Sequence, residues 1–485
     1  MKIIFTTSEI YPFSKTGGLA DVSFSLPKAL SSLDNEIMII SPLYKCIDRK
    51  KNRLKIVIPI LEIPMGWFKH FCSVWTSATP RKNLKIFFIE HERFYGRNGL
   101  YGESDYSYGD NLERFAMLSR ASLEIAKFYK FVPDIIHSND WQTALVPVFL
   151  RELEKTNPFF KKTKTLLTIH NMGYQGDFPV REFPLTGLYW DAFYRRSFEF
   201  YGKLNFLKAG LYNADKISTV SPSYAREILT YEGGWSLDGV LRDRKQDLVG
   251  ILNGVDYSIW NPATDKLIPF NYDVNDIENK MKCKLELQKR TGLPQSEQIP
   301  LFGVISRFAY QKGIDVLAQV IPKLLLENIQ FIILGDGDSY LEHIFGILPR
   351  HYPEKCASYI GYNNELSHMI EAGADFFIMP SRYEPCGLNQ MYSLKYGTLP
   401  VVRKAGGLAD TVENLDVYTG KGNGFVFNDL SQESLLNTIK WAYNIWRERP
   451  DFISKMRRAA MECDFSWKKS AISYMNLFKE MAGMN

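Results

Sequence analysis

The sequence lacks three features that would assign it to common classes of protein. It has only six cysteines in 485 residues and no Cys-x-x-Cys pair, so neither a zinc site nor a disulfide framework is predicted. No hydrophobic run approaches the ~18 residues of a membrane span. The chain opens with MKIIFTTSEI, which resembles neither a signal peptide nor a transit leader. We therefore expect a cytoplasmic protein.

Charge and composition narrow the class further. Lysine and arginine total 59 against 54 aspartates and glutamates, a net charge of +5. That balance is too mild and too dispersed to predict a nucleic acid or a membrane surface as a partner. Hydrophobic residues make up 45% of the chain and aromatic residues 14%, which is enough for two domains that each bury a core.

Several catalytic signatures are also missing. The chain contains no G-x-x-x-x-G-K-[ST], G-x-S-x-G or H-E-x-x-H, and GDGDSY at 335–340 lacks the last glycine of G-x-G-x-x-G. P-loop kinases, serine hydrolases, zinc proteases and simple dehydrogenases are therefore disfavoured. Asp336 and Asp338 could hold a metal on a nucleotide diphosphate, but they fit turn chemistry better, so no metal site is predicted.

Short apolar runs of strand length alternate with helix-length segments along the chain. Strands that are apolar on both faces and separated by helices make parallel sheets covered on each side. The runs fall into two sets, so we predict an α/β fold with two doubly wound domains. The predicted strands are 2–8, 36–41, 84–90, 134–138, 165–170 and 216–221 in the first set, and 301–306, 331–335, 357–361, 375–380 and 398–402 in the second.

A linker-like segment separates the two sets. Residues 248–276 are rich in Asn, Asp, Pro and Gly and show little helical period. We place the domain boundary there, which gives a first domain of 1–247 and a second of 248–464. Residues 465–481 carry a helical pattern of apolar residues that could pack on either domain.

Ligands of open parallel sheets bind beyond the carboxyl ends of the strands, where helix amino termini favour anions. The first such loop contains Lys15, Gly17 and Gly18. Glycines let the backbone approach a phosphate, and the lysine adds a point charge. A glycine turn with a solvated lysine is the alternative.

Two loops of the second domain carry charged residues. Arg307 ends a strand and Lys312 precedes a helix, an arrangement that suits a diphosphate, although two solvated surface cations are the alternative. Glu384 follows another strand, near the backbone N–H groups of Gly387 and Leu388. A phosphate would repel this carboxylate, so it fits the hydroxyls of a sugar better. Alternatively, it is an acid at a helix start.

Further candidates follow strands of the first set. His170 and Asn171 come directly after one strand, and Asp140 after another. The position at a strand end favours function for the histidine, although a lone histidine is more often structural. Asp140 serves equally well as a helix cap.

Five segments of the chain are, in order, KTGGLADV, TIHNMGYQG, ILNGVDYSIWNP, SRFAYQKGIDVL and PSRYEPCGLNQMYSLKYGTLPVVRKAGGLADTV. Together they resemble the bacterial glycogen synthases and plant starch synthases, which use a nucleotide-activated glucose. The resemblance covers nearly the whole chain. It implies a GT-B architecture, with two Rossmann-like domains facing across a deep cleft and the terminal helix, within 465–485, returning to the first domain.

The resemblance also implies roles for individual residues. Lys15 and its glycine loop would reach the donor phosphates and the incoming glucan, while Arg307 and Lys312 would hold the leaving diphosphate. Glu384 would bind the glucose hydroxyls. Among the others, backbone amides near Cys386, Gly387 and Leu388 would orient sugar and phosphate, His170 and Asn171 would line the sugar pocket, Asp140 would lie on the acceptor side, and Glu9 and Asp21 would support the first loop.

The chain departs from the wider group of two-domain sugar transferases at one position. Many of them carry a second glutamate, eight residues after the first, that binds the ribose, whereas Tyr392 stands there in this chain. The glycogen and starch synthases commonly lack that acid too. Ribose binding must therefore use other groups.

The reaction that the resemblance implies is transfer of glucose from ADP-glucose to the non-reducing end of an α-1,4-glucan, with retained configuration and release of ADP. The cations could neutralise the diphosphate, so we expect no cofactor and no metal requirement. The expected partners are ADP-glucose and glycogen or a maltooligosaccharide. Use of UDP-glucose, a non-catalytic glucan-binding role and the chemical route to retention are left open.

Overall fold

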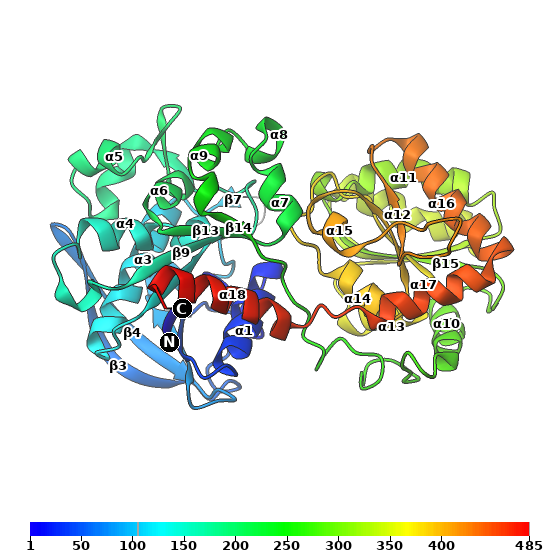
Figure 1. The fold of residues 1–485 in the computed structure, drawn as a ribbon, viewed down its shortest axis with the longest axis horizontal. Helices are drawn as coiled ribbons and strands as arrows, with labels where there is room; N and C mark the ends of the chain where they lie inside the picture. Colours follow the sequence, from blue (N-terminus) through cyan, green and yellow to red (C-terminus); the bar gives the residue numbers. More distant parts are fainter. Residues whose placement is uncertain (104–105, 485) are drawn as a thin grey trace. The chain divides into compact units, whose positions relative to one another are not determined.

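The computed structural model describes residues 1–103 and 106–484, and its parallel strands form two separate sheets (Figure 1). Unit 1 contains Met1–Gly254 and the chain from Trp467 onward, and unit 2 is Val255–Ser466. Leu248–Gly250 pairs with Lys216–Thr219 of unit 1, so residues 248–254 belong to unit 1 and not to the second domain predicted from the sequence.

The sheet of unit 1 has the order β14-β13-β9-β8-β1-β2-β5-β4-β3. The strands from β14 to β5 are parallel, and the order reverses between β1 and β8, as in doubly wound folds. β3 and β4 add an antiparallel hairpin that the sequence analysis did not predict. The strands are β1 Lys2–Thr6, β2 Glu36–Pro42, β3 Lys55–Met65, β4 Phe68–Ser77, β5 Leu84–Glu90, β8 Ile135–Asn139, β9 Lys164–Ile169, β13 Lys216–Thr219 and β14 Leu248–Gly250.

Helices pack on this sheet, and small elements decorate it. α18 packs beside α1, where the Asn35 amide donates to Met475 Sδ at 3.2 Å (Figure 1). The helices are α1 Gly18–Ser31, α2 Glu92–Tyr95, α3 Asn111–Phe128, α4 Leu145–Glu152, α5 Asp191–Arg195, α6 Phe206–Asn213, α7 Pro222–Glu227, α8 Tyr231–Gly234, α9 Asp238–Asp243 and α18 Trp467–Ala482. The short strands are β6 Gly102–Glu103, β7 Tyr106–Ser107, β10 Asp177–Pro179, β11 Glu199–Phe200 and β12 Lys203–Asn205.

The sheet of unit 2 is parallel, in the order β17-β16-β15-β18-β19-β20, which reverses between β15 and β18. Separate apolar clusters cover its two faces. The strands are β15 Leu301–Phe308, β16 Gln330–Gly337, β17 Cys356–Ile360, β18 Phe376–Met379, β19 Leu399–Arg403 and β20 Phe425–Phe427. The helices are α10 Glu278–Thr291, α11 Ile314–Leu324, α12 Ser339–His351, α13 Asn364–Gly373, α14 Asn389–Lys395, α15 Gly406–Thr411, α16 Gln432–Glu448 and α17 Pro450–Glu462.

The two ends of unit 2 lie side by side. Val255 forms a parallel bridge with Ser466, and its N–H donates to the carbonyl of Phe465 at 2.7 Å. Next to them, within unit 1, the backbone of Gly254 lies against Trp467.

Asp338, one of the two aspartates of GDGDSY, caps α12 by accepting from the N–H groups of Tyr340 and Leu341, which is the turn chemistry predicted for it.

None of the described helices is both long enough and apolar enough to span a membrane.

Candidate active site

The loop that follows β1 is held from below by a buried carboxylate. Glu9 is only 3% exposed, and it accepts hydrogen bonds from the N–H and the hydroxyl of Thr16 at 2.6 and 2.5 Å and from the N–H of Gly17 at 3.3 Å. The hydroxyl of Tyr101 donates to the same carboxylate at 2.6 Å. Glu9 thus binds the backbone of the glycine loop at two N–H groups, and Tyr101 is a further partner of Glu9 that the sequence did not indicate.

Lys15 lies at the tip of this loop. Its side chain is 44% exposed, and its Nζ pairs with the carboxylate of Asp21, on the first turn of α1, at 2.8 Å. Burial raises the pKa of Asp21, and the charge of Lys15 opposes that rise. A Cβ built on Gly17 would meet no atom within 4 Å, so the space above this glycine is open to a ligand.

Three predicted residues meet at the ends of β8 and β9. The Asp140 carboxylate accepts from the N–H of His170 at 2.6 Å, and the backbone of Asn171 also hydrogen bonds to it. His170 Nε2 lies 3.0 Å from Asn139 Oδ1. Burial lowers the pKa of His170 to about 3, so its imidazole is neutral near pH 7. Asp140 has φ of 55° and ψ of −173°, an unfavourable backbone conformation for a residue other than glycine.

Asp140 makes stability depend on pH. Burial raises its pKa from 3.8 to about 7, hydrogen bonds from the backbone of His170 and Asn171 oppose the rise, and the charge of Glu9 adds to it. The folded state therefore binds this proton more tightly than the unfolded state, and the stability this provides is lost as the pH rises from about 4 through about 7.

We expect Asp140→Asn, which cannot ionise, to gain stability relative to the wild type as the pH rises. The gain between about pH 5 and about pH 8 should amount to at most ~3 kcal/mol, at 1.36 kcal/mol per pKa unit. Urea denaturation of both proteins at the two pH values measures it. A stability difference between the two proteins that is the same at both pH values would contradict the raised pKa.

In unit 2, Lys312 and Glu384 form an ion pair. Lys312 Nζ lies 2.7 Å from Glu384 Oε2, and the hydroxyl of Ser381 donates to the same oxygen at 2.9 Å. The glutamate is 5% exposed, so this carboxylate is a largely desolvated acceptor beside a cation. From the sequence, Lys312 and Glu384 were predicted to contact different parts of the ligand, whereas in the structure they contact each other.

Arg307 lies at the end of β15, opposite Asp336 of β16 in the register. Its side chain is exposed, and across residues 1–103 and 106–484 its guanidinium makes neither a hydrogen bond nor an ion pair. It remains available for an anionic ligand beyond the strand ends.

Gly313 fixes the loop that carries Lys312. Its φ is +64°, and an added Cβ would lie 2.0 Å from the carbonyl oxygen of Pro380, at the end of β18. The backbone of this loop thus packs directly on the segment that leads to Glu384.

We therefore expect Gly313→Ala to lower the free energy of unfolding by about 2 to 4 kcal/mol, because it adds a clash to an unfavourable φ. Gly346→Ala, within α12, is the matched control in the same unit. The added Cβ would meet only the side chain of Ile360, at 3.9 Å. This change should be neutral or stabilise by about 0.5 to 1 kcal/mol. Thermal unfolding of both variants tests the comparison, and equal melting temperatures would show that Gly313 is not required.

The segment around Cys386, Gly387 and Leu388 precedes α14, which begins at Asn389. The amide of Gln390 donates to the carbonyls of Cys386 and Gly387, each at 3.0 Å. Gly387 has φ of +70°, and an added Cβ would lie 2.4 Å from Gln390 Oε1. Glycine is therefore needed for this turn.

Comparison with known proteins decides the family. The chain matches the model of the starch synthase catalytic domain over residues 2–243 and that of glycosyl transferases group 1 over residues 286–459. It is 46% identical over 479 residues to glycogen synthase 1 of Geobacter sulfurreducens, covering 99% of this chain and 96% of that protein. The chain belongs to the glycogen and starch synthase family.

Further matches agree. The chain is 46% identical over 487 residues to the glycogen synthase of Treponema denticola, covering 99% of this chain and 98% of that one. The catalytic domain of starch synthase IV from Arabidopsis thaliana, solved with ADP and acarbose, superposes with a TM-score of 0.91 at 31% identity over 99% of both chains. The predicted resemblance and the two-domain α/β fold of GT-B type are confirmed, and the protein is a glycosyltransferase.

Sequence reasoning overlooked an internal repeat in this family member. KAGGLADT at 404–411 differs from KTGGLADV at 15–22 at two positions, and each segment leads into a helix that begins at a glycine, α15 or α1. In the second copy, the N–H of Gly407 donates to the carbonyl of Glu384 at 3.0 Å. Comparison of the sequence with itself would have found this segment.

Tyr392, which stands where related transferases have a second glutamate, is engaged in packing. Its ring stacks on Trp260 with centroids 4.1 Å apart, and Trp260 stacks on His368 at 3.8 Å. The tyrosine is buried, so it serves as a ring in this stack.

Proposed function

We propose that this glycosyltransferase transfers glucose from ADP-glucose to the non-reducing end of an α-1,4-glucan, with retention of configuration and release of ADP. One observation carries the proposal: the chain matches, over 99% of its length, a starch synthase catalytic domain that binds ADP and acarbose. The curated glycogen synthases that it resembles support glycogen or a maltooligosaccharide as the acceptor.

The proposed roles follow the charges of each unit. The leaving diphosphate gains negative charge, so Lys15, Arg307 and Lys312 lower the barrier where they meet it, each by about 2 to 4 kcal/mol. These cations take the part that a metal plays elsewhere, and we propose that no metal or other cofactor is required. The exposure of Lys15 and the absence of a protein partner for Arg307 among the described residues support this role.

The proposed sugar-binding groups are mostly neutral or paired. Glu384, which pairs with Lys312, accepts hydrogen bonds from glucose hydroxyls. His170 binds a hydroxyl as a neutral imidazole, with Asn171 beside it. Asp140 lies toward the acceptor, and Glu9 and Asp21 hold the Lys15 loop in place. The backbone amides near Cys386, Gly387 and Leu388 orient the sugar and the phosphate.

The test is release of nucleotide from each of two donors. Purified protein is mixed with glycogen, a chelator and either ADP-glucose or UDP-glucose, and both free nucleotide and polymer growth are measured. Faster ADP release with polymer growth is the expected result. Faster UDP release would show that UDP-glucose is the preferred donor. Loss of activity when the chelator is added would show that a metal is required. No nucleotide release from either donor by the folded protein would favour a non-catalytic glucan-binding role.

A further inference from the structure

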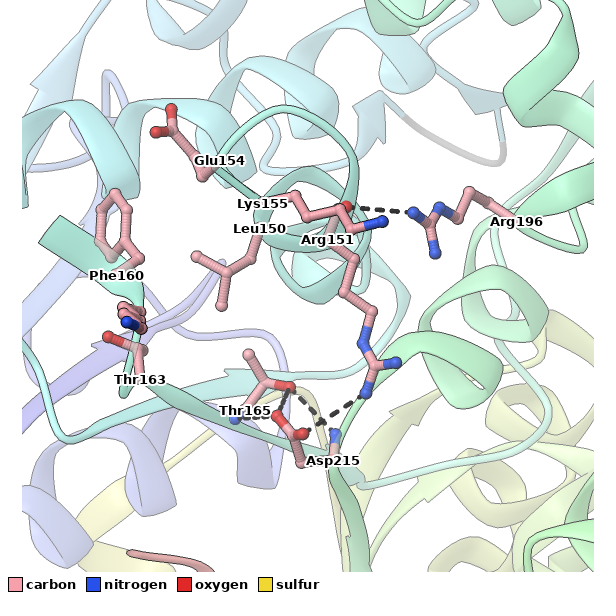
Figure 2. Close-up of a pocket in the computed structure, with 10 residues that line it drawn as sticks. Leu150, Arg151, Glu154, Lys155, Phe160, Thr163, Thr165, Arg196 and Asp215 are labelled. Carbon is pink, nitrogen blue, oxygen red and sulfur yellow. Dashed lines mark hydrogen bonds and ion pairs between the residues drawn. The ribbon is translucent and has the colours of Figure 1, made fainter. Parts of the chain in front are cut away.

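Unit 1 contains a pocket at the amino ends of its parallel strands, opposite to the carboxyl ends where the candidate site residues of this unit lie. The pocket has a volume of about 370 Å³ and opens where β9 and β13 begin, next to the end of α4 (Figure 2). Lys15, Asp140 and His170 follow the carboxyl ends of β1, β8 and β9, whereas Thr165 and Asp215 of the pocket lie at the amino ends of β9 and β13. The proposed reaction uses none of the pocket's residues.

The acidic residues of the pocket already have partners. Glu154 pairs with Arg120 at 2.9 Å and with Lys127 at 3.0 Å. Asp215 accepts from the N–H and the hydroxyl of Thr165 at 2.8 and 2.9 Å, and Arg151 approaches it at 3.4 Å (Figure 2). The charges of both carboxylates are therefore balanced by groups of the protein.

The basic residues exceed the acids that remain. Arg196 pairs with Glu152 at 2.7 Å and donates to the carbonyl of Arg151 at 3.0 Å. The ammonium groups of Lys155 and Lys161 form no hydrogen bond or ion pair with any residue that the structure describes, and both side chains are exposed. The pocket thus carries two unmatched positive charges.

The apolar part of the lining comes from Leu150 and Phe160, which are buried (Figure 2). An inorganic anion alone would leave this part of the pocket unfilled, and a neutral glucan would leave the two lysines without a counter-charge. The volume falls within the ~300–1,000 Å³ typical of sites for small molecules. A small molecule that carries an anionic group on a carbon skeleton matches the volume, the two lysines and the apolar side chains of the pocket.

We propose that this pocket binds a small phosphate-bearing metabolite, with Lys155 and Lys161 on the phosphate and Leu150 and Phe160 against the remainder of the molecule. Flexible lysines suit a phosphate as point charges. The site is separate from the donor site and would take its ligand whether or not ADP is bound.

Calorimetric titration of the intact protein tests this proposal. Saturating ADP occupies the donor site, and the two probes are inorganic phosphate and ribose 5-phosphate. We expect the wild type to bind ribose 5-phosphate with a stoichiometry of about one, and the double variant Lys155→Ala/Lys161→Ala to bind it at least tenfold more weakly. Lys162→Ala removes a neighbouring exposed lysine outside the pocket and should bind like the wild type.

The outcomes separate the possible ligands and the two proposals. Tighter binding of ribose 5-phosphate than of inorganic phosphate supports a phosphate monoester, and equal affinities support free phosphate. Absence of binding to the wild type, unchanged binding to the double variant, or equal weakening by Lys162→Ala overturns the site. Glucan synthesis without added phosphate should be the same in all these variants, so failure of the pocket leaves the proposed transferase reaction standing.

Discussion

Lys15→Ala should lower kcat for glucose transfer by roughly 30- to 1000-fold, the effect of ~2 to 4 kcal/mol lost from the transition state. The lysine meets the diphosphate as its charge develops, so the loss should fall mainly on kcat and less on KM. The fold should survive. Lys15 is 44% exposed, and an exposed pair such as Lys15 with Asp21 contributes about 0 to 1 kcal/mol to stability.

A matched variant separates this role from a general effect of surface charge. Lys69 pairs with Glu62 at 2.9 Å, is 52% exposed and lies on the β3–β4 hairpin of the same unit. Lys69→Ala should keep both the activity and the melting temperature of the wild type. Steady-state release of ADP from ADP-glucose measures both variants, and wild-type turnover by Lys15→Ala would refute the role of Lys15 in transfer.

Glu384→Gln should reduce kcat/KM for ADP-glucose by about 100- to 1000-fold, the range found when one preorganised polar contact to a reacting group is removed. The change keeps the size of the side chain but removes the charge that accepts from sugar hydroxyls and pairs with Lys312 at 2.7 Å. Since Lys312 loses the carboxylate that neutralises it, the variant should bind ADP at least as tightly as the wild type. A general disruption of the nucleotide site would weaken ADP instead.

Asp315→Asn is the control for this variant. Asp315 lies on α11 and pairs with Arg382 at 2.6 Å, so it is also a carboxylate of unit 2 held by a cation. It has no proposed contact with the sugar, and its loss should leave both kcat/KM and ADP affinity near the wild-type values. Calorimetry with ADP and kinetics with ADP-glucose measure nucleotide affinity and kcat/KM for both variants. An equal loss of activity in both variants would assign the effect to stability and not to the sugar contact.

The sequence predicted the central strands well because they are buried on both faces and read as continuous apolar runs. Every predicted segment overlaps a parallel strand of one of the two sheets. The β3–β4 hairpin was missed because one of its faces is solvated, with Ile56 and Ile60 exposed. β14 and β20 were missed because they span three residues each and carry too short a pattern. The division between the units lies within the predicted linker 248–276 but after Gly254 and not before Leu248, because pairing with β13 assigns β14 to unit 1.

Only the residues of the candidate site that a local sequence pattern indicates could be predicted. Strand ends pointed to Asp140 and His170 because parallel strands bring their carboxyl ends to one edge of the sheet. The pairing of Lys312 with Glu384 joins residues 72 positions apart, and Tyr101 reaches Glu9 over 92 positions. No local pattern encodes such contacts. The raised pKa of Asp140 likewise depends on burial that only the folded chain creates.

The bridge between Val255 and Ser466 gives the chain the topology of one domain inserted into another. The first unit is interrupted after Gly254 and resumes at Trp467, and these two residues are in contact. An inserted domain whose two chain ends are adjacent can be exchanged between related proteins without distorting the surrounding domain, because the chain enters and leaves it at one place. Residues 255–466 are therefore the natural segment to express alone, or to exchange with the corresponding segment of a relative, when donor preference is to be transferred between synthases.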